Sequence, residues 1–137
     1  MIGIIIVTHG QLGAELHKTA ELIIGGMEKC QTVSIEMNLN PDYLRGLIEK
    51  AVKEQDQGQG VLIITDMFGG TPSNISLSFL QEGRIEVLTG ASLPMLLRAF
   101  HLRERADMSL KDLAFDTKEY TKKAIHMASD LLGRRSK

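Results

Sequence analysis

The stretch that decides the fold is GIIIVTHGQLG, residues 3–13. A run of β-branched residues ends on Thr8, His9 and Gly10, and a helical pattern begins directly afterwards. A strand that is apolar throughout, without alternation, is covered on both of its faces. The stretch therefore predicts a buried strand over residues 2–8, with a histidine placed where that strand ends.

Strand-like and helix-like segments alternate along the rest of the chain. Apolar residues at helical spacing begin at Leu12, and Gly25 and Gly26 end that helix. Asn40 and Pro41 suit the N-cap and the first position of a second helix. Further strands are predicted over residues 32–37, 60–66 and 84–90, further helices after residues 70 and 92, and a last helical region over residues 109–132.

This alternation predicts an α/β fold, a doubly wound and mainly parallel sheet with helices on both faces. A small sheet that starts in the middle and reverses once, with right-handed crossovers, has the strand order 2-1-3-4. Ligands bind at that reversal, outside the carboxyl ends of the strands. His9 and Asp66 end the first and third strands, so we expect both at this place.

Composition limits the classes of function. The 137 residues make one domain, and a net charge of −1 gives no indication of a nucleic-acid partner. A single cysteine, Cys30, excludes an internal disulfide and suggests no cysteine-based metal site, and we expect no metal or cofactor. No stretch approaches a membrane span, and the apolar start is too short for a signal peptide, so we expect a cytoplasmic protein.

His9 and Asp66 form the first candidate for chemistry. A lone histidine in a turn is often structural, and an acid at the end of an apolar strand can simply cap a turn. The alternative is that Asp66 accepts a hydrogen bond from one ring nitrogen of His9, which fixes the tautomer and leaves the other nitrogen as a nucleophile. Gly10 allows a close approach to the ring.

The stretch FGGTPSN, residues 68–74, is the second candidate. It predicts a tight turn into a helix, with Thr71 as the N-cap and Pro72 at the first helical position. The free N–H groups of a helix start suit an anion. Beside His9 and Asp66 they would form a phosphate cradle, and the parts together describe a histidine that takes up a phosphoryl group.

Three motifs in register carry a family resemblance. VTHG at residues 7–10, TDMFGGTPSN at 65–74 and TGASLPM at 89–95 resemble the enzyme IIA domain of the mannose-type bacterial sugar phosphotransferase system, and the resemblance covers residues 1–132. Members of this family carry a phosphoryl group on the histidine of the first motif. They receive it from the phosphocarrier protein HPr and give it to a IIB domain, which phosphorylates a sugar during uptake.

The resemblance assigns roles to individual residues. It implies that His9 is phosphorylated, that Asp66 is its hydrogen-bond partner, and that Gly70 and Thr71 hold the phosphoryl group. Gly10 is a further phosphate-binding candidate, because it lets a ligand approach the ring. Thr71 stands where serine is frequent in the family, and its hydroxyl and N–H keep the same role.

The resemblance also implies partners. It implies a homodimer, and family dimers exchange an edge strand that we do not locate in residues 105–137. It implies indirect membrane association through IIC and IID components. We expect one enzyme IIA domain over residues 1–137 with no fused IIB domain, so that the IIB acceptor is a separate protein.

Other functions are left open or disfavoured. A non-transport regulatory phosphoprotein and the phosphoryl-donor subunit of a dihydroxyacetone kinase would use the same site. A hydrolase or mutase is disfavoured because Thr8, and not an arginine, precedes His9. Neither glycine-rich nucleotide-binding motif is present in the sequence.

The remaining candidate residues have weaker indications. Leu93, Pro94 and Met95 form an apolar patch that serves either core packing or partner docking. His17 and His126 fall in predicted helices and His101 in an exposed charged segment, and none is given a direct role.

Overall fold

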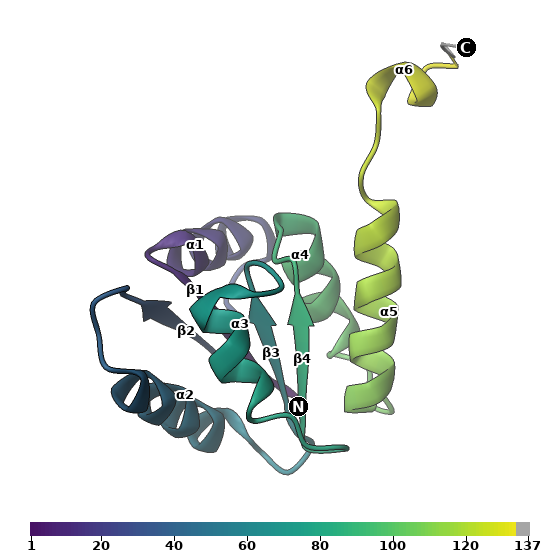
Figure 1. Ribbon diagram of the computed structural model, residues 1–137. Coiled ribbons are helices and arrows are strands. Elements are labelled where there is room, and N and C mark those ends of the chain that lie inside the picture. Colours follow the sequence, from purple (N-terminus) through teal and green to yellow (C-terminus); the bar gives the residue numbers. More distant parts are fainter. Residues whose placement is uncertain (134–137) are drawn as a thin grey trace.

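Strands and helices alternate in the computed structural model, which describes residues 1–133 (Figure 1). The elements are β1 (Gly3–His9), α1 (Leu12–Ile24), β2 (Cys30–Ile35), α2 (Pro41–Gln55), β3 (Val61–Thr65), α3 (Gly70–Leu77), β4 (Ile85–Thr89), α4 (Leu93–Leu102), α5 (Leu110–Lys123) and α6 (Ala128–Leu131). Within residues 1–133, no helix combines the length and the apolar character that a membrane crossing requires.

The four strands form one parallel sheet in the order β2-β1-β3-β4. This confirms the predicted α/β class and the predicted strand order. Helices α1, α4 and α5 pack on one face, and α2 and α3 pack on the other. The order in which strands are added to the sheet reverses between β1 and β3, because β2 lies on one side of β1 and β3 on the other. Val7 of β1 pairs with Thr65 of β3.

The core lies on both sides of β1 and β3. Side chains alternate between the two faces of a strand, so Ile4 and Ile6 join the cluster under α1 and α4, whereas Ile5 and Val7 join the cluster under α2. Each of these four side chains is fully buried. Each contributes about 1.5–3 kcal/mol by leaving water, and this burial explains why the strand lacks an alternating pattern.

Two boundaries differ from the sequence predictions. The second strand covers Cys30–Ile35 and not residues 32–37. The predicted helical region over 109–132 is wrong as one element, because α5 ends at Lys123 and the short α6 follows a break at Met127, whose backbone is extended. A helix persists mainly where its apolar face packs, and the side chains of Ile125, Met127, Leu131 and Leu132 stay exposed.

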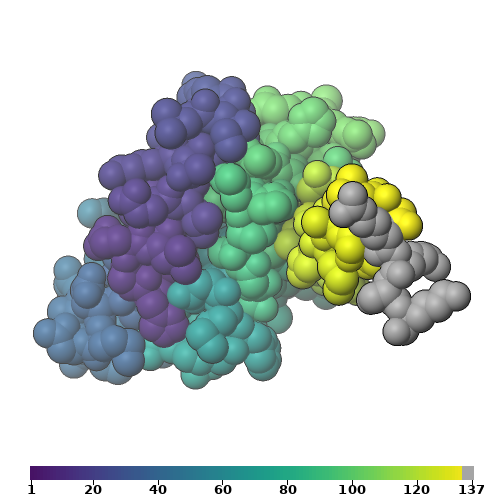
Figure 2. All heavy atoms as spheres, turned by 90° about the horizontal axis from the view of Figure 1, so that it is seen from above, coloured from purple at the N-terminus to yellow at the C-terminus, as the bar shows by residue number. Residues whose placement is uncertain are grey.

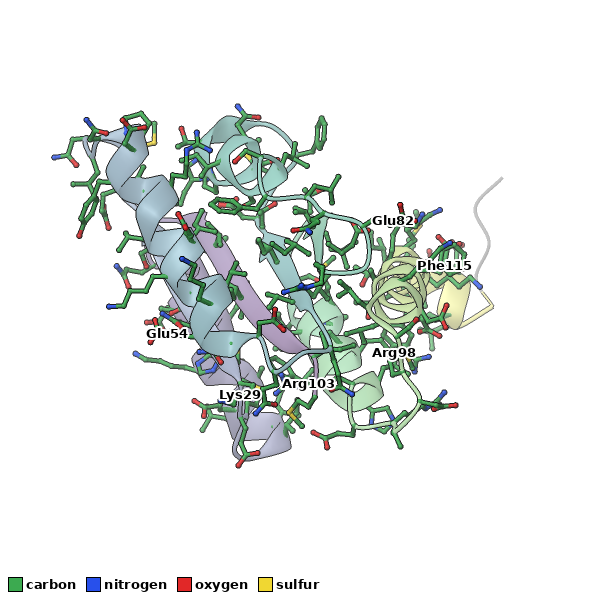
Figure 3. All side chains as sticks on the ribbon, turned by 90° about the horizontal axis from the view of Figure 1, so that it is seen from below. Lys29, Glu54, Glu82, Arg98, Arg103 and Phe115 are labelled. Atoms are coloured by element: carbon green, nitrogen blue, oxygen red, sulfur yellow. The ribbon has the colours of Figure 1, made fainter. Side chains whose placement is uncertain are left out.

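Arg103 closes the amino edge of the sheet, a role that its sequence position does not indicate. Its side chain is buried at the end of α4. Nη1 donates to the carbonyl oxygens of Ile2 (3.0 Å) and Lys29 (3.1 Å), and Nη2 donates to that of Glu28. Lys29 and Arg103 lie together at this edge when the molecule is viewed from below (Figure 3). Arg103 thereby joins α4 to β1 and to the segment before β2.

We expect Arg103→Met to destabilise the fold by about 3 kcal/mol or more, because buried carbonyl oxygens lose charged donors. Urea unfolding followed by circular dichroism measures this change. The exposed Arg105 on the following turn offers a control, and Arg105→Met should change the free energy of unfolding by less than about 0.5 kcal/mol. Equal effects of the two substitutions would show that Arg103 does not act as described.

Candidate functional site

His9 and Asp66 meet at the carboxyl edge of the sheet. His9 is the last residue of β1, and Asp66 directly follows β3, the neighbouring strand. The side chain of His9 is 36% exposed and that of Asp66 is 10% exposed. The ring is therefore reachable from solvent while its acidic partner is nearly enclosed, an arrangement that suits a reactive group with a fixed support.

The Asp66 carboxylate holds both the backbone and the ring of His9. Oδ2 accepts from the backbone N–H of His9 at 3.0 Å and lies 2.8 Å from Nδ1 of the ring. Oδ1 accepts from the N–H of Met67 at 3.0 Å. An ionised carboxylate can only accept, so Nδ1 carries the hydrogen and Nε2 carries the lone pair. The geometry thus leaves Nε2 as the ring nitrogen with a free lone pair.

The pKa of Asp66 is lowered from its ordinary value. Partial burial by itself raises this pKa, but hydrogen bonds from the backbone and ring of His9, and the charge of that ring, together lower it. Asp66 is therefore ionised at neutral pH. A lowered pKa in the folded state stabilises the fold above the unfolded pKa, and this contribution is lost as the pH falls through the folded value.

The start of α3 lies against the free side of the histidine ring. Gly69 and Gly70 have φ values of +86° and +81°. A methyl group on Gly70 would lie 3.2 Å from Cε1 and 3.4 Å from Nε2 of His9. The ring thus faces the first turn of α3, where backbone N–H groups have no partner in the helix. An anion bound to these N–H groups would therefore lie next to Nε2 of His9.

The predicted N-cap of this helix is wrong by two residues. Gly69 occupies the N-cap position and α3 begins at Gly70, so Thr71 and Pro72 already lie in the first turn. The two glycines adopt left-handed backbone conformations that other residues rarely adopt, and they complete the turn before Thr71. This places the Thr71 N–H among the first amides of the helix rather than ahead of them.

Gly10 and Thr8 fix the chain on either side of His9. Gly10 has a φ of +51°, and its N–H donates to the carbonyl of Ile35 on β2 at 3.1 Å. The buried hydroxyl of Thr8 accepts from the N–H of Gly13 at 2.7 Å, which attaches the start of α1 to β1. The backbone on both sides of His9 therefore has little freedom.

The other sequence candidates lie elsewhere. Met95 is 2% exposed and belongs to the core, so of its two predicted roles the structure supports core packing. Leu93 and Pro94 are half-buried. His17 lies on α1 and His101 near the end of α4. The prediction that His126 lies in a helix is wrong, because it falls between α5 and α6. Among residues 1–133, no cluster of His, Cys, Asp and Glu has a metal-site arrangement.

The structure is thus a parallel α/β domain with an oriented histidine at its switch point and a helix start that faces the ring, an arrangement that suits phosphoryl transfer. The family model described as the fructose IIA component of the phosphotransferase system (EIIA-man) matches residues 3–116. The chain belongs to this family, whose members are phosphotransferase components, and its general role is that of a phosphoryl carrier in a sugar phosphotransferase system.

Relatives and solved structures agree with this membership. The chain is 31% identical to the fructose-specific EIIA component of Bacillus subtilis over 96% of its own length and 90% of the relative's. It is 31% identical to the mannose-specific EIIAB component of Escherichia coli over 75% of its length, and it spans 32% of that longer protein. The EIIA structure from Streptococcus agalactiae superposes with a TM-score of 0.84 at 28% identity, covering 95% of this chain and 99% of that one.

Proposed function

We propose that His9 accepts a phosphoryl group on Nε2 from phospho-HPr and passes it to a IIB domain during sugar uptake. One observation carries the proposal: Asp66 lies 2.8 Å from Nδ1, which leaves Nε2 unprotonated and turned to the start of α3. This role also places the chain in the cytoplasm, joined to the membrane only indirectly through the transporter components.

The transfer needs no protein base. The lone pair of Nε2 on His9 forms a bond to phosphorus as the N–P bond of the donor breaks, and the donor ring keeps that electron pair. Positive charge grows on the His9 ring, and the ionised Asp66 stabilises it through Nδ1–H. The N–H groups of Gly70 and Thr71 and the Thr71 hydroxyl donate to the phosphoryl oxygens.

The site is suited to passing the group on as well as holding it. The loop residues 10–12, 36–42 and 66–71 contain no lysine or arginine. Backbone amides therefore supply the partial positive charge, which neutralises the phosphoryl oxygens less strongly than fixed cations would. A carrier must give up its phosphoryl group in the next step, and the weaker neutralisation of the phosphoryl oxygens favours this release.

Incubation with phosphoenolpyruvate, enzyme I and HPr tests the proposed function. Intact-protein mass spectrometry should show one added phosphoryl group, and mild acid should remove it, because phosphohistidine is acid-labile. If donors that phosphorylate another IIA protein leave this chain unmodified, the proposal is wrong.

Gly70→Ala should slow phosphorylation by phospho-HPr about tenfold, because a left-handed φ strains alanine by about 1–3 kcal/mol and its methyl group would press on Nε2 of His9. Gly58→Ala is the matched control, since Gly58 also has a positive φ but has open space around it, far along the chain from the site. Single-turnover kinetics measure both. Equal slowing by the two substitutions would show that the contact of Gly70 with the His9 ring has no specific effect on phosphorylation.

The same proposal includes a homodimer. Beyond Lys123 the chain leaves the body of the molecule, and α6 stands apart from the sheet (Figure 1). The apolar side chains of Ile125, Met127, Leu131 and Leu132 are exposed on this segment. Exposed apolar surface of this extent favours burial against another chain, and a second copy supplies it. Residues 105–133 contain the helices α5 and α6 and no strand, so an exchanged edge strand has no counterpart in the described part of this region.

A further inference from the structure

A cavity of about 630 Å³ opens at the amino edge of the sheet, between the end of α1 and the second half of α4. Figure 3 shows the molecule from this edge and labels Arg103, one of the residues that line the cavity. Ile24, Met27 and Leu97 form its apolar wall, and the buried Phe100 also lines it. Cavities of this volume, with apolar walls and a few polar groups, are typical of binding sites.

The apolar wall of the cavity remains partly exposed. Ile24 is 44% exposed, whereas Met27 and Leu97 are half-buried and pack against the core. Apolar surface that gathers in a hollow gains free energy when a second molecule covers it. The wall therefore favours an occupant with apolar side chains.

Three carboxylates border the same cavity, those of Glu21, Glu28 and Glu104. Glu28 and Glu104 are exposed, and neither forms an ion pair with another residue in the range 1–133. Glu21 lies 3.7 Å from Nδ1 of His17. Carboxylates that have no cation of their own attract positive charge on a binding partner.

The cationic groups that line the cavity bond to other parts of the chain. The two Nη atoms of Arg103 donate to three main-chain carbonyl oxygens, and the amino group of Met1 donates to Oε1 of Gln57 at 3.3 Å. Nε of Arg103 is buried and finds no acceptor in the described part of the chain. Buried donors normally have a partner, so this nitrogen indicates an acceptor that the chain itself does not supply.

We propose that this cavity binds a segment of a partner protein that carries both basic and apolar side chains. The apolar side chains would cover the apolar wall, and the basic ones would pair with Glu28 and Glu104. A main-chain carbonyl of the segment would supply the acceptor for Nε of Arg103. A peptide segment brings these three kinds of group together, whereas a simple amine brings only the charge.

The cavity and His9 lie at opposite edges of the sheet. Strand β1 runs from Gly3 at the amino edge to His9, and a strand of this length spans about 20 Å. Figure 2 shows the His9 edge from above, where the purple chain after β1 lies between the blue segment before α2 and the teal segment before α3. A partner held in the cavity therefore leaves His9 open, and it can stay bound while phosphoryl groups are exchanged.

Titration of the nitrogen-labelled protein with a short synthetic peptide of leucine and lysine tests this proposal. Proton–nitrogen NMR should show shifts for the amides of residues 21–28 and 97–104, which border the cavity. The amides around His9 should not shift. A peptide of the same length made of leucine and glutamate should not bind, because the carboxylates at the cavity repel it.

Ile24→Ser should weaken binding of the leucine–lysine peptide about tenfold, because central apolar contacts dominate interface affinity. Glu28→Gln combined with Glu104→Gln should weaken binding to a similar extent and reduce its dependence on salt. Leu22→Ser is the matched control, since Leu22 is 88% exposed on the same turn of α1. Two residues lie about 200° apart around a helix, so Leu22 faces away from Ile24, and its replacement should leave binding unchanged.

Equal weakening by Ile24→Ser and Leu22→Ser would overturn the proposal, as would amide shifts confined to other parts of the chain. Equal binding of the leucine–glutamate peptide would also overturn it. A synthetic peptide of residues 125–137 tests a second copy of this chain as the occupant, and tighter binding of that peptide would replace the partner protein by a second copy. These readouts involve no phosphorylation, so the proposed function stands or fails independently of them.

Discussion

His9→Gln should abolish phosphorylation by phospho-HPr, so that intact-protein mass spectrometry detects no added phosphoryl group. Glutamine keeps a side-chain N–H that can donate to Asp66, as Nδ1 of His9 does at 2.8 Å. It has no nitrogen lone pair that can attack phosphorus. A loss of phosphorylation in this variant would therefore come from the missing nucleophilic nitrogen and not from a lost hydrogen bond to Asp66.

His101→Gln is the matched control for this loss. His101 is exposed in the last turn of α4, and it should retain full phosphorylation when replaced. Unfolding by urea should give similar stabilities for the His9 and His101 variants. A His9→Gln protein that still accepts one acid-labile phosphoryl group would place the reactive histidine elsewhere.

Asp66→Asn should slow the phosphorylation of His9 about 100-fold or more, because the amide cannot replace the carboxylate at Oδ2. That oxygen accepts from both the backbone N–H and the ring of His9. An amide nitrogen in this place donates to Nδ1, which moves the ring hydrogen to Nε2 and removes the nucleophilic lone pair. The positive charge that grows on the ring also loses its counter-charge.

Single-turnover transfer from phospho-HPr measures this effect, and nitrogen NMR of the histidine ring reports the tautomer. We expect the hydrogen on Nδ1 in the wild-type chain and on Nε2 in Asp66→Asn. Asp107→Asn, at an exposed position between α4 and α5, controls for loss of an acid. An unchanged tautomer with an unchanged rate would remove Asp66 from the mechanism.

The sheet order and the meeting of His9 and Asp66 were predictable from the sequence. Apolar strands that alternate with helices leave one common topology for a sheet of this size. The residues that end the first and third strands then share the carboxyl edge. Nothing beyond local pattern and chain connectivity was needed for this part of the site.

The features that the sequence did not predict depend on contacts between residues far apart in the chain. Arg103 bonds to the carbonyl of Ile2, 101 positions away along the chain, and no local pattern indicates such a contact. The N-cap of α3 is Gly69 and not the predicted Thr71, because Gly69 and Gly70 adopt positive φ values that let the helix begin earlier, and the close approach of the His9 ring favours glycine at position 70. The sequence left Met95 open between core packing and partner docking, and the structure places its side chain in the core.

The central claim is that Nε2 of His9 carries the phosphoryl group, and nitrogen–phosphorus NMR of the phosphorylated, isotope-labelled protein tests it most directly. The account predicts a phosphoryl group on Nε2 of His9, with the hydrogen retained on Nδ1 opposite Asp66. Phosphate on Nδ1, or on any other residue, would contradict it.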